Sequence, residues 1–172
     1  ATFASTAAAL GLPKPVSVQQ AYNLLNRNDF ESGMVEACAV RNSDMGLLVY
    51  SPLAGGTLSG KYILKDDDRL AHARLHQFPG FFARYNSEQS REAIAQYRLI
   101  ADDFGVTLAQ MALAFVYTRP FVSSTIVGAT SVEQLKENIL ALNVPITDET
   151  LTKINEQYLE MRDPSKIIST NV

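Results

Sequence analysis

A glycine-rich segment that ends in lysine is the first feature with chemical potential. Residues 55–61 read Gly-Gly-Thr-Leu-Ser-Gly-Lys and match the start of a phosphate-cradling P-loop. The next residue is Tyr62, whereas a P-loop needs a serine or threonine there to hold Mg²⁺. No apolar-periodic helix begins at Lys61, so a helix N-terminus for phosphate is missing as well. A nucleoside triphosphatase is therefore not predicted, and a turn shaped by glycines is the simpler interpretation.

Two short polar segments follow predicted strands and form a second candidate. Residues 50–53 read Tyr-Ser-Pro-Leu and residues 128–131 read Gly-Ala-Thr-Ser. Parallel α/β sheets bind ligands at the carboxyl ends of their strands. The second segment also precedes a predicted helix, so an anion near Thr130 and Ser131 would meet free backbone N–H groups. The alternative is purely structural, with Ser131 as the helix N-cap and Gly128 as a tight exit from the strand, and the residues alone leave both open.

Basic residues in the long connection between residues 51 and 86 are a third candidate. Arg69, Arg74 and Arg84 follow Lys61 in this connection and could clamp a phosphate, because arginine offers bidentate geometry. Solvated charge is the simpler explanation, since the acidic run 66–68 lies beside them. A connection of this length without periodicity is expected to be functional or disordered.

The histidines and the cysteine of the sequence do not predict a metal site or a reactive thiol. His72 and His76 are four residues apart but lack a third ligand, so no metal site is predicted. Cys38 is the single cysteine and lies on the apolar face of a predicted helix, where core packing is the expected role. One cysteine forms no internal disulfide, which favours a reducing compartment, either the cytoplasm or an organelle stroma.

The elements that must position these residues alternate between strand and helix. The pattern predicts helices over residues 4–10, 29–40, 87–104, 107–118, 131–142 and from 147 onward, and strands over residues 16–19, 46–50 and 124–128. The uninterrupted apolar run 46–50 is typical of a strand covered on both faces in a parallel sheet. Thr107 with Gln110, and Ser131 with Gln134, have the spacing of capping boxes, whereas the tail from Asp163 is expected to be loose. The sum is an α/β fold with a parallel sheet.

The composition and net charge argue against some classes of binding partner. The 172-residue chain is 47% hydrophobic, which is ordinary for a globular protein. Its 15 Lys and Arg against 18 Asp and Glu give a net charge of −3, which argues against nucleic acid as a partner. The longest apolar stretches fall short of the ~20 residues that a membrane span needs, so no membrane association is predicted.

Four ordered blocks together resemble the aldo-keto reductase family, in its Tas-like subgroup. The blocks are residues 19–27, residues 46–62, residues 73–75 with 78–80, and residues 126–138. The resemblance covers essentially the whole chain, residues 1–172, but corresponds to only the C-terminal half of a family member. It implies the C-terminal part of a (β/α)₈ TIM barrel, with about three parallel strands and flanking helices, in a protein that reduces aldehydes or ketones with NADPH.

The resemblance also assigns cofactor-binding roles residue by residue. Gln19 is similar to the amide that hydrogen-bonds the nicotinamide carboxamide, and Tyr50 to the ring that stacks on the nicotinamide. The remaining matches are Ser51, Pro52, Leu53 and Lys61 in the loop around the pyrophosphate, Arg74 near the 2′-phosphate, and Gly128, Thr130, Gln134, Glu137 and Asn138 in the adenosine pocket. The P-loop lookalike thus becomes part of a cofactor loop.

No catalytic residue is assigned to this chain. The family uses an Asp, Tyr, Lys and His tetrad that gives a proton to the carbonyl as hydride arrives, and all four lie in the N-terminal half. We therefore expect a chain that holds most of the NADP(H) site without the proton-transfer machinery. Its expected partners are a small carbonyl substrate in the intact protein and either the missing N-terminal half-barrel or a second copy. The alternative is a catalytically inactive NADP-binding or regulatory remnant.

Overall fold

The computed structural model of the chain describes residues 2–63, 73–78, 80 and 82–166. Its centre is a three-stranded sheet of β1 (Ser17–Ala21), β2 (Gly46–Tyr50) and β3 (Val122–Thr125), in the order β1-β2-β3. Both pairs of neighbours are parallel. The predicted α/β class with about three parallel strands is confirmed.

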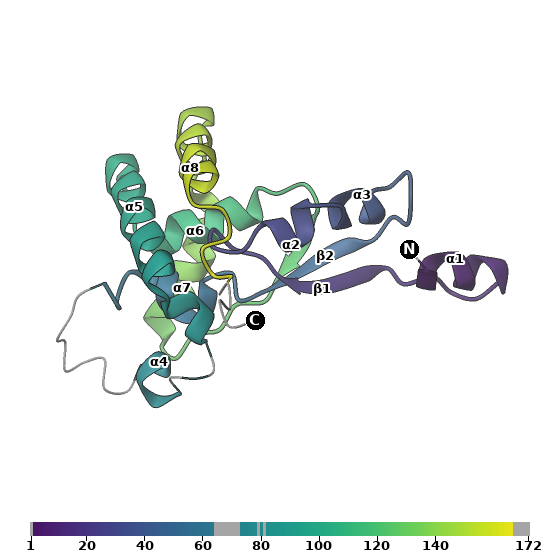
Figure 1. Ribbon diagram of the computed structural model, residues 1–172, viewed down its shortest axis with the longest axis horizontal. Helices are drawn as coiled ribbons and strands as arrows, with labels where there is room; N and C mark the ends of the chain where they lie inside the picture. The colour runs from purple at the N-terminus through teal and green to yellow at the C-terminus, as the bar shows by residue number, and fades with distance from the viewer. Residues whose placement is uncertain (1, 64–72, 79, 81, 167–172) are drawn as a thin grey trace, which may run out of the picture.

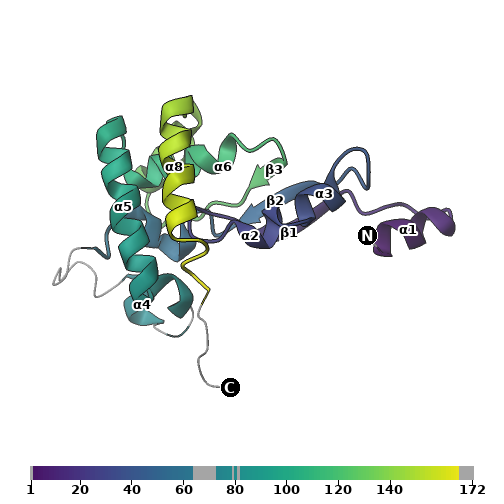
Figure 2. The ribbon, with the colours of Figure 1, turned by 45° about the horizontal axis from the view of Figure 1, so that its top comes forward.

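Helices surround the sheet unevenly. They are α1 (Thr2–Ala9), α2 (Asn28–Glu31), α3 (Met34–Cys38), α4 (Arg74–Gln77), α5 (Glu88–Phe104), α6 (Leu108–Tyr117), α7 (Val132–Leu140) and α8 (Asp148–Glu160), with 3₁₀ turns η1 (Ala54–Ser59), η3 (Ala83–Asn86) and η4 (Ala141–Asn143). Helices α5 and α8 stand side by side at one end of the molecule, while α1 lies apart beyond the start of β1 (Figures 1 and 2).

The sheet has one covered face and one open face. Leu47 and Val49 of β2 are fully buried and belong to the same core cluster as Phe115 of α6. Alternate residues of a strand point to opposite faces, and on the other face Tyr50 is 40% exposed. The expectation that residues 46–50 are covered on both faces is therefore wrong for this chain, because the described helices cover one face alone.

The third strand differs from the sequence-based expectation in place and in burial. It occupies residues 122–125 instead of 124–128, and Ile126 just after it is exposed. A register shift between Leu47 and Leu48 puts an extra residue, Ser123, beside Gly46. A Cβ on Gly46 would lie 2.7 Å from the Ser123 Cβ, so this irregularity needs glycine at residue 46. β3 is an edge strand here, which explains its exposure.

Two other expectations need correction. The helix predicted over residues 29–40 is broken into α2 and α3 at Gly33, whose φ of 102° no helix contains. The tail is not loose where it is described, since Asp163 and Ser165 are buried. Asp163 Oδ1 accepts hydrogen bonds from the backbone N–H groups of Arg27 and Asn28 at 2.9 and 3.0 Å.

The remaining helices follow their local signals. Ser87 caps α5 and Gly105 ends it in the left-handed conformation, while Thr107 and Gln110 form the predicted capping box of α6. Within the described residues no single helix is long and apolar enough to cross a membrane; α5 and α6 reach that length and composition only together, and they bend by 90° at the break.

Candidate functional site

The carboxyl ends of β1 and β2 present two side chains on the open face of the sheet. Gln19 is in register with Leu48, and Ala21 with Tyr50, so Gln19 and Tyr50 share one face two residues apart along the strands. Both side chains are exposed. An amide that can donate and accept thus lies near an aromatic ring, an arrangement suited to a flat, polar ring system.

A strained turn follows β2, and a buried asparagine forms a hydrogen bond with its backbone. Ser51 has a positive φ of 52°, and its carbonyl accepts a hydrogen bond of 2.9 Å from Asn23 Nδ2. Asn23 is fully buried and also donates to the Tyr85 hydroxyl at 3.3 Å. Pro52 is buried and Leu53 packs against the core, so the start of this loop is fixed to the fold. This supporting role of Asn23 has no local sequence signal, because its hydrogen-bond partners lie far along the chain.

Backbone conformation and lack of space both require glycine at residue 55 of the turn. Gly55 has a φ of 68°, and a Cβ there would lie 2.9 Å from Cγ of the Phe82 ring. Any other residue at this position would be strained and would displace the ring. After Gly60 the described residues 61–63 are turn residues.

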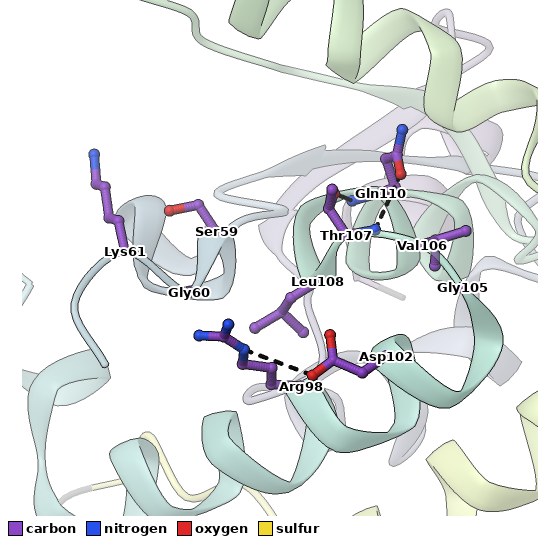
Figure 3. A pocket seen from close by; sticks show the side chains of 10 residues that line it. All are labelled: Ser59, Gly60, Lys61, Arg98, Asp102, Gly105, Val106, Thr107, Leu108 and Gln110. Atoms are coloured by element: carbon purple, nitrogen blue, oxygen red, sulfur yellow. Dashed lines mark hydrogen bonds and ion pairs between the residues drawn. The ribbon is translucent and has the colours of Figure 1, made fainter. Parts of the chain in front are cut away.

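A groove of about 590 Å³ runs between η1 and the junction of α5 with α6. Lys61 lines it on the η1 side and Arg98 on the α5 side (Figure 3). The Arg98 Nε is 3.8 Å from Asp102 Oδ2, and both side chains are largely exposed. The remaining lining comes from Ser59 and Gly60 and from Gly105, Val106, Thr107, Leu108 and Gln110. The place of Arg98 in this groove could not be predicted from the sequence, because an exposed helical arginine paired at i,i+4 gives no signal of a groove.

The residues matched to an adenosine pocket lie together around the start of α7. Gln134 Oε1 accepts from the Thr130 backbone N–H at 2.9 Å and from the Thr130 hydroxyl at 3.1 Å. Asn138 is buried and its Nδ2 donates to the Gly128 carbonyl at 3.4 Å. The sequence block 128–138 therefore folds back on itself and forms one small structural unit.

A side-chain hydrogen bond joins this unit to a residue that lines the groove. Thr107 Oγ1 donates a hydrogen bond of 2.7 Å to Glu137 Oε1, which joins the start of α6 to α7. Thr107 also lines the groove that contains Lys61. Thr107 thus lines the same groove as Lys61 and also contacts the block at residues 128–138.

The N-terminus of α7 differs from the predicted capping box. Ser131 Oγ accepts from the Gln134 backbone N–H at 3.2 Å as expected, but the reciprocal bond of Gln134 goes to Thr130. Glu133 in the first turn has its pKa lowered by hydrogen bonds from its own backbone N–H and from Ser131. A carboxylate therefore already interacts with this helix start, and an incoming anion would compete with it.

The basic residues of the long connection divide into two groups. Arg74 begins α4, but its side chain lies outside the described residues, as do Arg69 and His72. Arg84 lies 4.6 Å from the ring centroid of Tyr85, which favours a structural role. The predicted clamp therefore retains Lys61 as its described member.

Metal and thiol chemistry are not supported in the described part of the chain. Those residues contain no group of three or more His, Cys, Asp or Glu side chains that could hold a metal ion. Cys38 is buried, and burial raises the pKa of its thiol, so it stays protonated and unreactive near neutral pH.

Comparison with known proteins gives matches that cover most of the chain. The sequence model of the Aldo/keto reductase family matches residues 4–158. An aldo-keto reductase of Babesia bovis is 40% identical over 168 residues, which cover 96% of this chain and 59% of that protein. Protein tas of Escherichia coli K12 is 44% identical over 143 residues, 83% of this chain and 40% of that protein.

A third relative adds a named reaction. L-glyceraldehyde 3-phosphate reductase of Escherichia coli O157:H7 is 33% identical over 145 residues, which cover 83% of this chain and 41% of that protein. The chain therefore spans between 40% and 59% of the length of these relatives and corresponds to their C-terminal part.

Proposed function

The chain belongs to the aldo/keto reductase family, and from this premise we propose that it holds NADPH in an enzyme that reduces aldehydes or ketones by hydride transfer. The observation that carries the proposal is the placement of Gln19 and Tyr50 on one open sheet face, beside the turn that follows β2. The relative named as a reductase of L-glyceraldehyde 3-phosphate supports an aldehyde as the class of substrate.

The residues present fit this cofactor in shape and charge. Tyr50 offers an exposed ring for stacking, and the Gln19 amide can pair with a carboxamide. The turn at Ser51, Pro52 and Leu53, with Lys61 beyond it, would hold the pyrophosphate through backbone groups and one cation. Arg74 is the proposed contact of the 2′-phosphate.

The adenosine end of the cofactor is assigned to the block around α7. Gly128, Thr130, Gln134, Glu137 and Asn138 are the proposed contacts, and hydrogen bonds of Gln134 with Thr130 and of Asn138 with Gly128 give this block a fixed shape. When bound, NADPH supplies the hydride. The residues of this chain bind and orient it, and they leave the open sheet face to the substrate.

A binding titration tests this proposal directly. We expect the purified chain to bind NADPH in the micromolar range, measured by the change in NADPH fluorescence. Lys61→Ala should weaken binding about fivefold to tenfold, because a charge-assisted contact to phosphate is lost. Lys14→Ala is the matched control, since Lys14 pairs with Asp44 near the amino end of the sheet and should leave binding unchanged. Absence of any NADPH binding by the wild-type chain would overturn the proposal.

We also propose that proton transfer is supplied by chain outside these residues. A tyrosine that donates a proton near neutral pH needs a lowered pKa. Burial instead raises the pKa of Tyr22, Tyr85, Tyr97, Tyr117 and Tyr158. These tyrosines are therefore poor proton donors and serve the core of the fold.

The open edge of the sheet supports a partner that brings further parallel strands. Within the described residues β3 pairs with β2 alone, and a groove of about 350 Å³ lies between β3 and α7. Thr125 Oγ1 lines this groove and is buried without a described hydrogen-bond partner. The apolar side chains left exposed on and just after α7 are Val132, Leu135, Ile139, Leu140 and Leu142. The partner is the complementary N-terminal half-barrel or a second copy of the chain.

Turnover distinguishes this proposal from a self-sufficient enzyme. The purified chain should leave NADPH unoxidised in the presence of 4-nitrobenzaldehyde, measured by absorbance at the NADPH band. Adding a polypeptide that carries the remaining strands and the Asp, Tyr, Lys and His tetrad of a relative should produce carbonyl-dependent oxidation. Oxidation by the pure chain alone would contradict the proposal, whereas binding without turnover in the mixture would favour the inactive NADP-binding remnant.

A further inference from the structure

The hydroxyl of Thr107 has two hydrogen-bonding tasks at the start of α6. Its Oγ1 accepts from the Gln110 backbone N–H at 3.1 Å, which caps the helix. The same hydroxyl donates a hydrogen bond of 2.7 Å to Glu137 Oε1, across a sequence separation of 30 residues. Since the cap uses a lone pair, the hydroxyl proton stays free for Glu137.

Glu137 needs such a contact to keep one conformation. It lies in the middle of α7 and is only partly covered, and a free glutamate side chain there would sample several rotamers. Its neighbours in the adenosine-side block are fixed from within that block, Gln134 by Thr130 and Asn138 by Gly128. Among the described residues, Glu137 is instead held from α6, through Thr107.

We propose that Thr107 is a positioning residue that fixes the Glu137 carboxylate for the adenosine end of the cofactor. This inference rests on the cofactor site proposed above and names a residue that neither the family resemblance nor the sequence motifs assign to it. Thr107 touches no reacting atom. It acts by removing the entropic cost of ordering the Glu137 side chain when the cofactor binds. Such a cost lowers the affinity by up to about tenfold.

Three substitutions separate positioning from capping and from charge. Thr107→Asp keeps a strong N-cap acceptor but has no proton to donate at neutral pH. Thr107→Ser keeps both tasks. Thr147→Asp makes the same change at the N-cap of α8, where Thr147 Oγ1 accepts from the Thr150 backbone N–H, and it leaves the Thr107 hydroxyl in place.

The first readout is the affinity for NADPH, measured by fluorescence titration of the full chain. We expect Thr107→Asp to bind about tenfold more weakly, and Thr107→Ser and Thr147→Asp to stay within about twofold of wild type. Thermal unfolding of each variant checks that the fold is intact. Wild-type affinity in Thr107→Asp, or an equal loss in Thr147→Asp, would overturn the inference.

The second readout does not depend on the cofactor. Glu137→Gln replaces the carboxylate by an amide that can donate to the aspartate introduced at residue 107, so this double variant should regain the contact. We expect Glu137→Gln to raise the urea midpoint in the Thr107→Asp background and to lower it in wild type. Strictly additive midpoints would overturn the positioning role even if the wild-type chain failed to bind NADPH, a failure that would count against the proposed function alone.

Discussion

Replacing Arg27 by methionine is expected to lower the free energy of unfolding by about 3 kcal/mol. The Arg27 side chain is only 8% exposed, and its Nε and Nη2 contact the two carboxylate oxygens of Glu31 at 3.0 and 3.1 Å. Its Nη1 donates to Asn155 Oδ1 at 3.0 Å. The guanidinium also lies 4.3 Å from the ring centroid of Tyr158 and 5.0 Å from that of Phe115.

The size of this effect follows from what the substitution leaves behind. Methionine can fill much of the space between the rings, but Glu31 loses its cationic partner and Asn155 loses a donor. Removing one member of a buried ion pair costs about 3 to 5 kcal/mol. The lower end applies because the Glu31 side chain is 27% exposed and water can reach it in part.

Urea unfolding at neutral pH measures the difference, and the chain offers a matched control. Arg41 pairs with Glu36 on the surface, where their side chains are 74% and 58% exposed. Arg41→Met should therefore leave the free energy of unfolding nearly unchanged. If Arg27→Met were as stable as Arg41→Met, the buried cluster would not be a major source of stability.

The Arg27 cluster matters for the candidate site because it fixes the chain just after β1. Tyr22 donates a hydrogen bond of 2.5 Å to Glu31 Oε1, and Ser165 Oγ donates to the Leu25 carbonyl at 2.8 Å. With Asp163 bound to the backbone of Arg27, helix α8 and the segment after it hold the carboxyl end of β1. The position of Gln19 on the open face thus depends on contacts at the other end of the sequence.

Elements with strong local signals could be predicted from the sequence. The run at β2, the helix over residues 87–104 and the capping box of α6 depend on residues close together in the sequence, and the structure reproduces them. The break at Gly33 has a local cause as well. Its neighbours are compatible with a helix, however, so helical periodicity continued across it.

Features built from distant residues could not be predicted in this way. The register shift at Ser123 arises from contact with Gly46, and the burial of Asp163 arises from backbone groups near residue 27. The same reason explains the candidate site. Sequence motifs located the block at residues 128–138, but the link from Glu137 to Thr107 joins two helices and has no local pattern.

Alkaline pH is expected to destabilise the fold through its buried tyrosines. Burial, followed by the nearby Asp163 carboxylate, raises the pKa of Tyr158 to about 12. Burial also raises the pKa of Tyr97 and of Tyr22, and Glu31 adds to the shift at Tyr22. In the folded state these hydroxyls stay protonated at a pH where the unfolded chain has already lost the protons.

The sign and slope follow from proton linkage. A raised pKa in the folded state contributes stability that is complete below the unfolded pKa of about 10 and is lost as pH rises toward the folded pKa. Each tyrosine held protonated lowers the free energy of unfolding by about 1.4 kcal/mol per pH unit. Tyr22, Tyr97 and Tyr158 alone contribute a fall of about 4 kcal/mol per pH unit above pH 10, and the raised pKa values of Tyr85 and Tyr117 add to it.

Urea unfolding at a series of pH values from about 9 to about 11.5 measures this slope. Tyr158→Phe should make the slope shallower by about 1.4 kcal/mol per pH unit, because one protonated hydroxyl is removed. Met111→Ala is the matched control, since a buried methionine without a titrating group should lower stability equally at every pH. A free energy of unfolding that stays constant through this range would contradict the raised pKa values of these hydroxyls.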